Sequence, residues 1–181
     1  MTVSLSKAGE YTSLVLAEGD QLLASAVDAP EQPLFLYGAN RYVGLLPTAA
    51  SQLTLSFKRG AETTSAEVVL PEAFALTVPS DPITGNDPIP LSWEQGSADN
   101  DLSIAVNGPC VTSFVRSLES DTGSYTLQPG DLFFSAVPIG AGPCTLAISV
   151  TRTLQGGSLP LGAGGTLSVE QVRTAALEIT P

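Results

Sequence analysis

The sequence predicts an all-β fold made of two β-sandwich modules, and three observations support this prediction. Apolar and polar residues alternate along many short segments, which is the period of a half-buried strand. Turn-forming residues separate these segments, with 17 glycines and 14 prolines among 181 residues. No long segment has the i, i+3, i+4, i+7 spacing of an amphipathic helix. Because 43% of the residues are hydrophobic, the chain can bury a substantial core.

The first half contains the clearest alternation. Leu53, Leu55 and Phe57 alternate with polar residues and predict a strand with one buried face. The segments 33–37 and 42–46 flank Gly38-Ala39-Asn40, which predicts a hairpin.

A proline-rich stretch at 79–88 holds few residues that can pack, so it is the best candidate for a linker. We place a module boundary there, which gives modules of residues 1–82 and 83–181. One larger sandwich with a long loop at this place is the alternative.

The second half begins again with strand patterns. Leu91 and Trp93 share one face of a predicted strand, and we expect Trp93 to be buried. Alternation recurs at 102–106 and 146–150. Towards the end we expect a loose glycine-rich connection around 156–165, one helical turn at 169–172 and a final strand over 175–179.

Two cysteines, Cys110 and Cys144, each follow a Gly-Pro pair, so each is expected just after a turn, where a strand begins. No histidine is present and no metal-ligand spacing surrounds either cysteine. An even, minimal count in a β-rich chain predicts one structural disulfide. Two buried free thiols are the alternative, which the count alone does not exclude.

The segment Pro90-Leu91-Ser92-Trp93-Glu94, followed by an alternating strand through Ile104, resembles the early strands of fibronectin-III-like and immunoglobulin-like sandwiches. In those folds a tryptophan on an early strand fills the core. The resemblance implies that residues 83–181 form such a sandwich. The segment Asp121-Thr122-Gly123-Ser124-Tyr125 partly matches the tyrosine corner of immunoglobulin domains, but Leu127 stands where the cysteine would follow, so we expect only a turn leading into a strand.

A wider pattern is similar to uncharacterised secreted proteins and lipoproteins of Gram-negative bacteria. It consists of Arg59, 68–71, 91–93, 121–125 and 151–152. The resemblance implies an extracytoplasmic compartment and a fold, and no activity. No signal peptide is visible at Met1-Thr2-Val3. We therefore expect a periplasmic, outer-membrane-anchored or secreted protein whose export signal has been removed, with an N-terminal lipid anchor possible in the precursor. No run reaches the roughly 18 apolar residues of a transmembrane segment.

The charge is strongly negative, with 18 acidic and 7 basic residues and a net charge of −11. Nucleic-acid binding needs clustered lysines and arginines, which this chain lacks, so we expect no nucleic-acid partner. Two interpretations of this acidity are open. It keeps the protein soluble, or it binds calcium or a cationic partner. Asp99, Asn100 and Asp101 are the candidate Ca²⁺ ligands, although they miss the EF-hand spacing and are also ordinary turn formers. No other cofactor is expected.

Catalytic signatures are absent. Without histidine, a Ser-His-Asp triad cannot form, and the most common general base is missing. Ser4 and Lys7 match the Ser-x-x-Lys pattern of β-lactamases, but they lie in an alternating segment without the partner motifs, so we attribute the match to coincidence.

Aromatic residues around the predicted hairpin are candidate ligand-binding residues: Tyr37, Arg41 and Tyr42, with Phe35 on the same face as Tyr37. If these aromatic residues are exposed, they could stack on a sugar or anchor a protein partner. If they are buried, they are core residues. We expect a non-catalytic extracytoplasmic module that is structural or binds a protein partner at the cell envelope. A carbohydrate-binding module is the alternative, and a carboxylate-based hydrolase is third.

Overall fold

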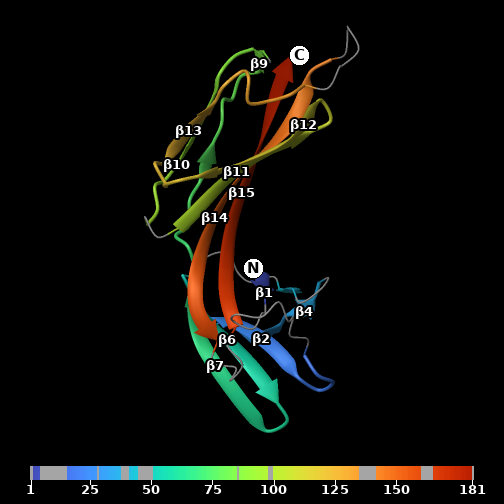
Figure 1. Ribbon diagram of the computed structural model, residues 1–181, viewed down its shortest axis with the longest axis vertical. Helices are drawn as coiled ribbons and strands as arrows, with labels where there is room; N and C mark the ends of the chain where they lie inside the picture. The colour runs from blue at the N-terminus through green and yellow to red at the C-terminus, as the bar shows by residue number, and fades with distance from the viewer. Residues whose placement is uncertain are drawn as a thin grey trace. The chain divides into compact units, whose positions relative to one another are not determined.

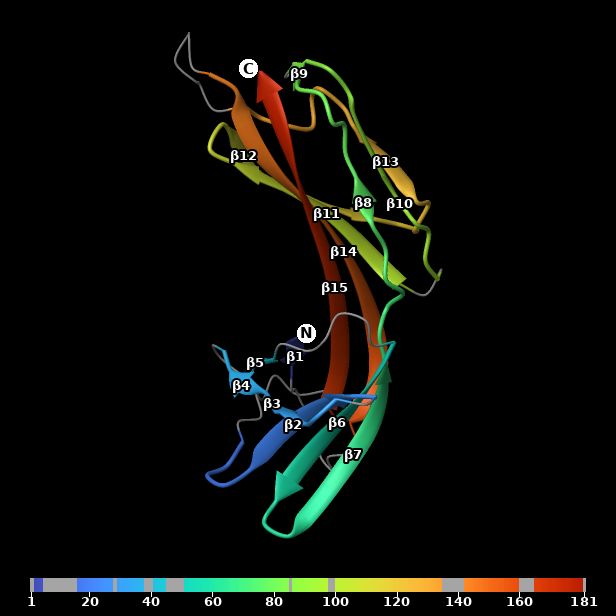
Figure 2. The same ribbon diagram turned by 180° about the vertical axis from the view of Figure 1, so that it is seen from behind.

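The computed structural model describes residues 2–4, 16–27, 29–37, 41–44, 51–84, 86–97, 100–134, 142–159 and 165–180. Every regular element in these ranges is a β-strand (Figures 1 and 2). The all-β class predicted from the sequence is therefore confirmed for the part of the chain that the structure describes.

The chain forms two compact units. Unit 1 comprises Met1–Ala73 and Thr153–Gln171, and unit 2 comprises Phe74–Arg152 and Val172–Pro181. The two longest of the described strands, β14 (Cys144–Leu159) and β15 (Gly165–Thr180), contribute residues to both units. From the sequence we predict two modules that are each continuous in sequence, 1–82 and 83–181, whereas each of these units combines two separate segments of the chain. The predicted module bounds remain a prediction.

Unit 1 contains two antiparallel sheets with the strand orders β3-β2-β6-β7 and β1-β5-β4. Their strands are β1 (Thr2–Ser4), β2 (Gln21–Ala26), β3 (Gln32–Pro33), β4 (Phe35–Leu36), β5 (Arg41–Val43), β6 (Gln52–Arg59) and β7 (Glu62–Val69). Gly60 turns β6 into β7 with a φ of 58°, which glycine adopts without steric cost. The buried core consists of Leu22, Ala24, Ala26, Leu34, Tyr42, Leu53, Leu55, Val68 and Val169.

Unit 2 also contains two sheets, with the strand orders β13-β10-β8 and β12-β11-β14-β15-β9. The strands besides β14 and β15 are β8 (Leu76–Thr77), β9 (Ile83–Thr84), β10 (Ile89–Trp93), β11 (Asn100–Gly108), β12 (Val111–Leu118) and β13 (Ser124–Leu127). Both sheets supply side chains to one core. Its central members are Ile89, Leu91, Trp93 and Leu127 from the smaller sheet and Leu102, Ile104, Val106, Leu146, Ile148, Val150, Leu177 and Ile179 from the larger one.

Alternation along β10 and β14 explains how these strands fill the core. On β10, Ile89, Leu91 and Trp93 are buried while the residues between them are exposed. The predicted burial of Trp93 is therefore confirmed. Along β14 the buried positions run from Cys144 at every second residue and end at Arg152, a charged residue with no exposed surface.

The structure corrects three sequence-based predictions about elements. Gly156 and Gly157 lie inside β14 instead of in a loose connection, and residues 169–172 lie inside β15 instead of in a helical turn. The sequence also predicts a strand over 73–78, of which only β8 (Leu76–Thr77) forms. In the first two cases, pairing between the long neighbouring strands β14 and β15 outweighs the weak preference of the two glycines for a loop and of residues 169–172 for a helical turn. The hairpin around 38–40 is confirmed by the pairing of β4 with β5, although its loop lies outside the described residues. Residues 162–164 of the expected glycine-rich connection also lie outside them.

Candidate functional site

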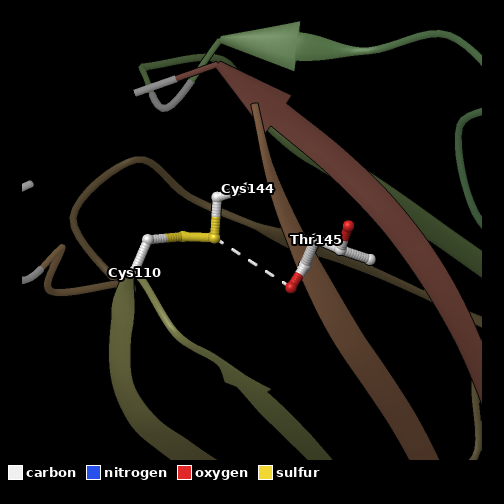
Figure 3. The surroundings of a disulfide bond; sticks show 3 residues. All are labelled: Cys110, Cys144 and Thr145. Carbon is white, nitrogen blue, oxygen red and sulfur yellow. Dashed lines mark hydrogen bonds between the residues drawn. A yellow bond between two sulfur atoms is a disulfide. The ribbon is translucent and has the colours of Figure 1, made fainter. Parts of the chain in front are cut away.

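Cys110 and Cys144 form a disulfide, as the sequence predicts (Figure 3). Their Cα atoms lie 6.3 Å apart. Cys110 lies in the turn between β11 and β12, and Cys144 is the first residue of β14. Because β11 and β14 are neighbours in one sheet, the bond ties the β11–β12 turn to the start of a strand of the same sheet. The conserved disulfide of antibody domains instead joins two sheets.

A buried ion pair between Asp121 and Arg152 is the most organised polar group in the described part of unit 2. Both side chains are fully buried. Arg152 donates two hydrogen bonds to Asp121 Oδ2, from Nη2 at 2.7 Å and from Nε at 3.1 Å. It also donates from Nη2 to the carbonyl oxygen of Glu94 at 2.7 Å. A buried charge needs such partners because removing it from water is costly.

The carboxylate of Asp121 accepts further hydrogen bonds. Trp93 Nε1 donates to Oδ1 at 2.7 Å, Gly123 N donates to Oδ1 at 3.1 Å, and Gly96 N donates to Oδ2 at 3.0 Å. Burial alone would raise the pKa of Asp121, but the hydrogen bonds from Trp93, Gly96, Arg152 and Gly123 outweigh burial and lower this pKa. Asp121 therefore stays ionised near neutral pH and is unsuited to act as a general acid or base there.

An aromatic ring completes this cluster. The guanidinium carbon of Arg152 lies 4.5 Å from the centre of the Phe74 ring, and that of Arg173 lies 5.6 Å from it. Arg173 Nε also donates to the carbonyl oxygen of Phe74 at 2.8 Å. Two guanidinium groups thus lie near the Phe74 ring, and Arg173 binds its carbonyl oxygen. These contacts hold Phe74, the first residue of unit 2, in place. The arrangement is structural, because its polar groups point at one another.

Sequence reasoning did not identify this cluster, although one signal was present. Leu146, Ile148 and Val150 predict an inward face, and continuing the alternation by one step places Arg152 on it. An inward arginine requires a buried acidic partner. The sequence does not say which acid that is, because Asp121 lies 31 positions away.

The predicted ligand-binding residues Tyr37, Arg41 and Tyr42 do not form one exposed group. Tyr42 is 3% exposed in the core of unit 1, and its hydroxyl oxygen accepts a hydrogen bond from Leu16 N at 2.9 Å. Its ring therefore offers no face to a ligand. Arg41 lies in β5, and its side chain is outside the described part of the structure.

Phe35, Leu36 and Tyr37 are consecutive, large and exposed, and we call them the exposed apolar segment. Their exposed fractions are 66%, 51% and 66%. Phe35 and Leu36 form β4, which is a border strand of its sheet (Figure 2). Within the described ranges β4 pairs only with β5, and none of the described strands covers its other edge.

The predicted Ca²⁺ ligands are only partly described. Asp101 is an exposed residue of β11, Asn100 begins that strand, and Asp99 lies outside the described residues. Over the ranges that the structure covers, no three His, Cys, Asp or Glu residues come together as a metal site would require. Those ranges also contain no helix with the length and hydropathy needed to cross a bilayer.

Comparisons with known proteins give no family for this chain. No family model matches it, and no curated protein matches it. The geometry described above is therefore what bears on its function.

Proposed function

We propose that the protein is a non-catalytic, extracytoplasmic module that binds a protein partner of the cell envelope through the exposed apolar segment. The observation that carries this proposal is the exposure of three consecutive large apolar side chains, Phe35, Leu36 and Tyr37. Strand alternation puts Phe35 and Tyr37 on one face, and exposed apolar groups that lie together mark interaction sites. Aromatic residues often supply most of the binding energy at such sites. Phe35 and Leu36 form the border strand β4, whose edge away from β5 no described strand covers, and this edge offers backbone hydrogen bonds to an extended partner.

The strand order of unit 2 supports a sandwich of the fibronectin-III or immunoglobulin type. The order β8-β10-β13 corresponds to A-B-E in such domains, and β12-β11-β14-β15 corresponds to C′-C-F-G. Trp93 lies in the core on the strand that corresponds to B. Many cell-surface domains share this architecture, although fold alone does not define function.

The disulfide supports an extracytoplasmic location. Disulfides persist in oxidising compartments and are rare in the cytosol, where thiols are kept reduced. A periplasmic, outer-membrane-anchored or secreted protein fits this chemistry, and a lipid anchor on the precursor belongs to the same proposal.

The absence of histidine supports a non-catalytic role. The most organised polar cluster among the described residues, around Asp121 and Arg152, is buried and internally satisfied, so it contributes to stability instead of to substrate turnover.

Site-specific photo-crosslinking in native cells tests the proposal. A photoreactive phenylalanine analogue replaces Tyr37 in one variant and Val27 in the control, because Val27 is equally accessible in the same unit but lies outside the exposed apolar segment. We expect a discrete protein adduct from position 37 only, and we expect the Phe35→Ser/Tyr37→Ser double variant to lose the corresponding complex. Equal labelling at both positions, or no protein adduct at position 37, contradicts the proposal.

A carbohydrate-binding module is the second candidate, because Phe35 and Tyr37 are both exposed aromatic residues within three positions. Aromatic rings stack on the apolar faces of sugars. Glycan-array binding by the native protein that Tyr37→Ala abolishes would favour this candidate. Glycan binding that survives Tyr37→Ala would remove the assignment of the site.

A further inference from the structure

Among the described strands, β12 lies at the border of the five-stranded sheet of unit 2 (Figure 1). Within the described residues, β12 pairs with β11 on one side. On the other side, only its first residues have neighbours: Val111 bridges to Phe134, and Thr112 N donates to Phe133 O at 2.8 Å. From Ser113 onward, none of the strands that the structure describes covers this edge.

The directions of the side chains and of the backbone groups along β12 follow from the register. Phe114 lies opposite Val106 and Arg116 opposite Ile104, so both face the core side of the sheet. Val115 faces the other way and is 69% exposed. Residues on one face of a strand direct their N–H and C=O groups to the same edge. The pairing register with β11 shifts by one residue between Val106 and Gly108, so Thr112 and Val115 are both exposed although they are three positions apart. Thr112 donates its N–H away from β11, and beyond the shift Val115 and Ser117 likewise present their backbone groups at the outer edge of β12.

The sequence of this outer edge is complementary to itself. Residues 113–117 read Ser-Phe-Val-Arg-Ser. Antiparallel pairing with a second copy, centred on Val115, places Val115 opposite Val115, Phe114 opposite Arg116 and Ser113 opposite Ser117. The apolar, cation–π and hydroxyl pairs that result are each favourable across neighbouring strands. The edge therefore fits a second copy of this chain.

The distribution of charge also permits self-association at β12. Two copies with a net charge of −11 repel each other over most of their surfaces. β12 contains no acidic residue, and Arg116 is balanced within its own copy by Asp131 at 3.6 Å and by the Tyr125 ring at 5.5 Å. By contrast, β7, another border strand of eight residues, carries Glu62 and Glu67, which oppose edge-to-edge pairing.

From these observations we infer that two copies of the protein associate by antiparallel pairing of β12 with β12, centred on Val115. The paired segment ends at Ser113, because Phe133 occupies the backbone edge at Thr112. Exposed Phe133 adds apolar area beside it. A five-residue pairing buries less than the roughly 1,200 Å² of a stable interface, so we expect a weak, transient dimer. This interface lies in unit 2, whereas the exposed apolar segment lies in unit 1, so the two proposals can fail separately.

Sedimentation equilibrium of the full chain over about three decades of protein concentration tests the inference. We expect a monomer–dimer equilibrium for the native protein. Val115→Lys places two ammonium groups opposite each other and raises the dimer Kd by at least about tenfold. Val69→Lys, an equally drastic change at an exposed position of β7, is the matched control and leaves the Kd unchanged. Unchanged Trp93 fluorescence and far-UV circular dichroism verify that both variants are folded.

Cysteine substitution tests the register. In the proposed pairing the Cα atoms of the two Val115 residues are roughly 5.5 Å apart, within disulfide reach. Val115→Cys therefore gives a covalent dimer under mild oxidation. Ser117→Cys gives none, because its counterpart in the second copy lies four residues along the strand. A protein that stays monomeric, a dimer that Val115→Lys leaves intact, or a Val115→Cys variant that bonds only to a different protein in cells each overturns the inference.

Discussion

At the residue scale, the ion pair between Asp121 and Arg152 should contribute strongly to stability. Asp121→Asn leaves Arg152 buried without a countercharge, which typically costs about 3–5 kcal/mol in the free energy of unfolding. Urea denaturation followed by far-UV circular dichroism measures this loss. Glu31→Gln is the control, because Glu31 and Lys58 form an exposed pair whose loss costs less than about 1 kcal/mol. Equal losses in the two variants would contradict a structural role for the buried pair.

The lowered pKa of Asp121 gives stability a definite pH dependence. Burial opposes the shift, but the hydrogen bonds to the carboxylate dominate, so the folded pKa lies below the unfolded value of about 4. A lowered folded pKa means that the stabilisation is complete above about pH 4 and is lost as the pH falls through the folded pKa. We expect the native protein to lose stability on acidification more steeply than Asp121→Asn, so the difference between them narrows below about pH 4. Denaturation curves across this pH range measure the difference, and parallel pH profiles would refute the assignment.

Individual buried positions were predictable where a strand alternates. The pattern around Trp93 placed its side chain inside, and the structure confirms it. Tyr37 and Tyr42 show the limit of such reasoning, since neighbouring aromatic residues of one hairpin have opposite environments. Whether each tyrosine is buried or exposed depends on which part of the hairpin packs against the core, and the spacing of the two residues in the sequence does not contain that information.

At the element scale, the disulfide ties the β11–β12 turn to the start of β14. Replacing both Cys110 and Cys144 by Ala should lower the free energy of unfolding by about 2–4 kcal/mol, since the closed loop no longer restricts the unfolded chain. Denaturation of the native protein and of the double variant measures this difference. Thiol titration of the unfolded, unreduced native protein should find no free thiol, and two thiols per chain would overturn the prediction.

The turn before β13 depends on Gly123. Its φ is +75°, and a Cβ atom at this position would lie 3.1 Å from the carbonyl oxygen of Trp93. Gly123→Ala should therefore cost about 1–2 kcal/mol through backbone strain. Gly130→Ala is the matched control, because a Cβ atom there meets nothing within 4 Å and the backbone has no positive φ. Thermal denaturation of both variants distinguishes the two sites, and equal melting temperatures would contradict the prediction.

Strand positions were easier to predict than strand lengths. Alternation located β6, β10, β11 and the first part of β14. It did not predict that β14 continues through two glycines to Leu159 or that β15 extends over sixteen residues. Pairing between these two strands decides their length, and a partner strand is not visible in local sequence.

At the scale of the whole molecule, we expect the two units to unfold together, because they share the strands β14 and β15. Both strands contribute residues to both units, so unfolding one unit removes part of the strands on which the other depends. Trp93 is the only tryptophan and lies in the core of unit 2, whereas far-UV circular dichroism reports on both units. We expect the red shift of Trp93 fluorescence and the loss of circular dichroism to coincide in urea. Two separated transitions would show that the units unfold independently.

The placement of these two strands has a consequence for biosynthesis. Residues 144–180 are translated after the rest of both units, yet both units include parts of them. Domains usually fold on the ribosome in the order in which they emerge. Here neither unit has its full set of contacts until these residues leave the exit tunnel, because even the core of unit 1 includes Val169. We therefore expect both units to fold only after residues 144–180 have left the ribosome, and not one after the other as they emerge.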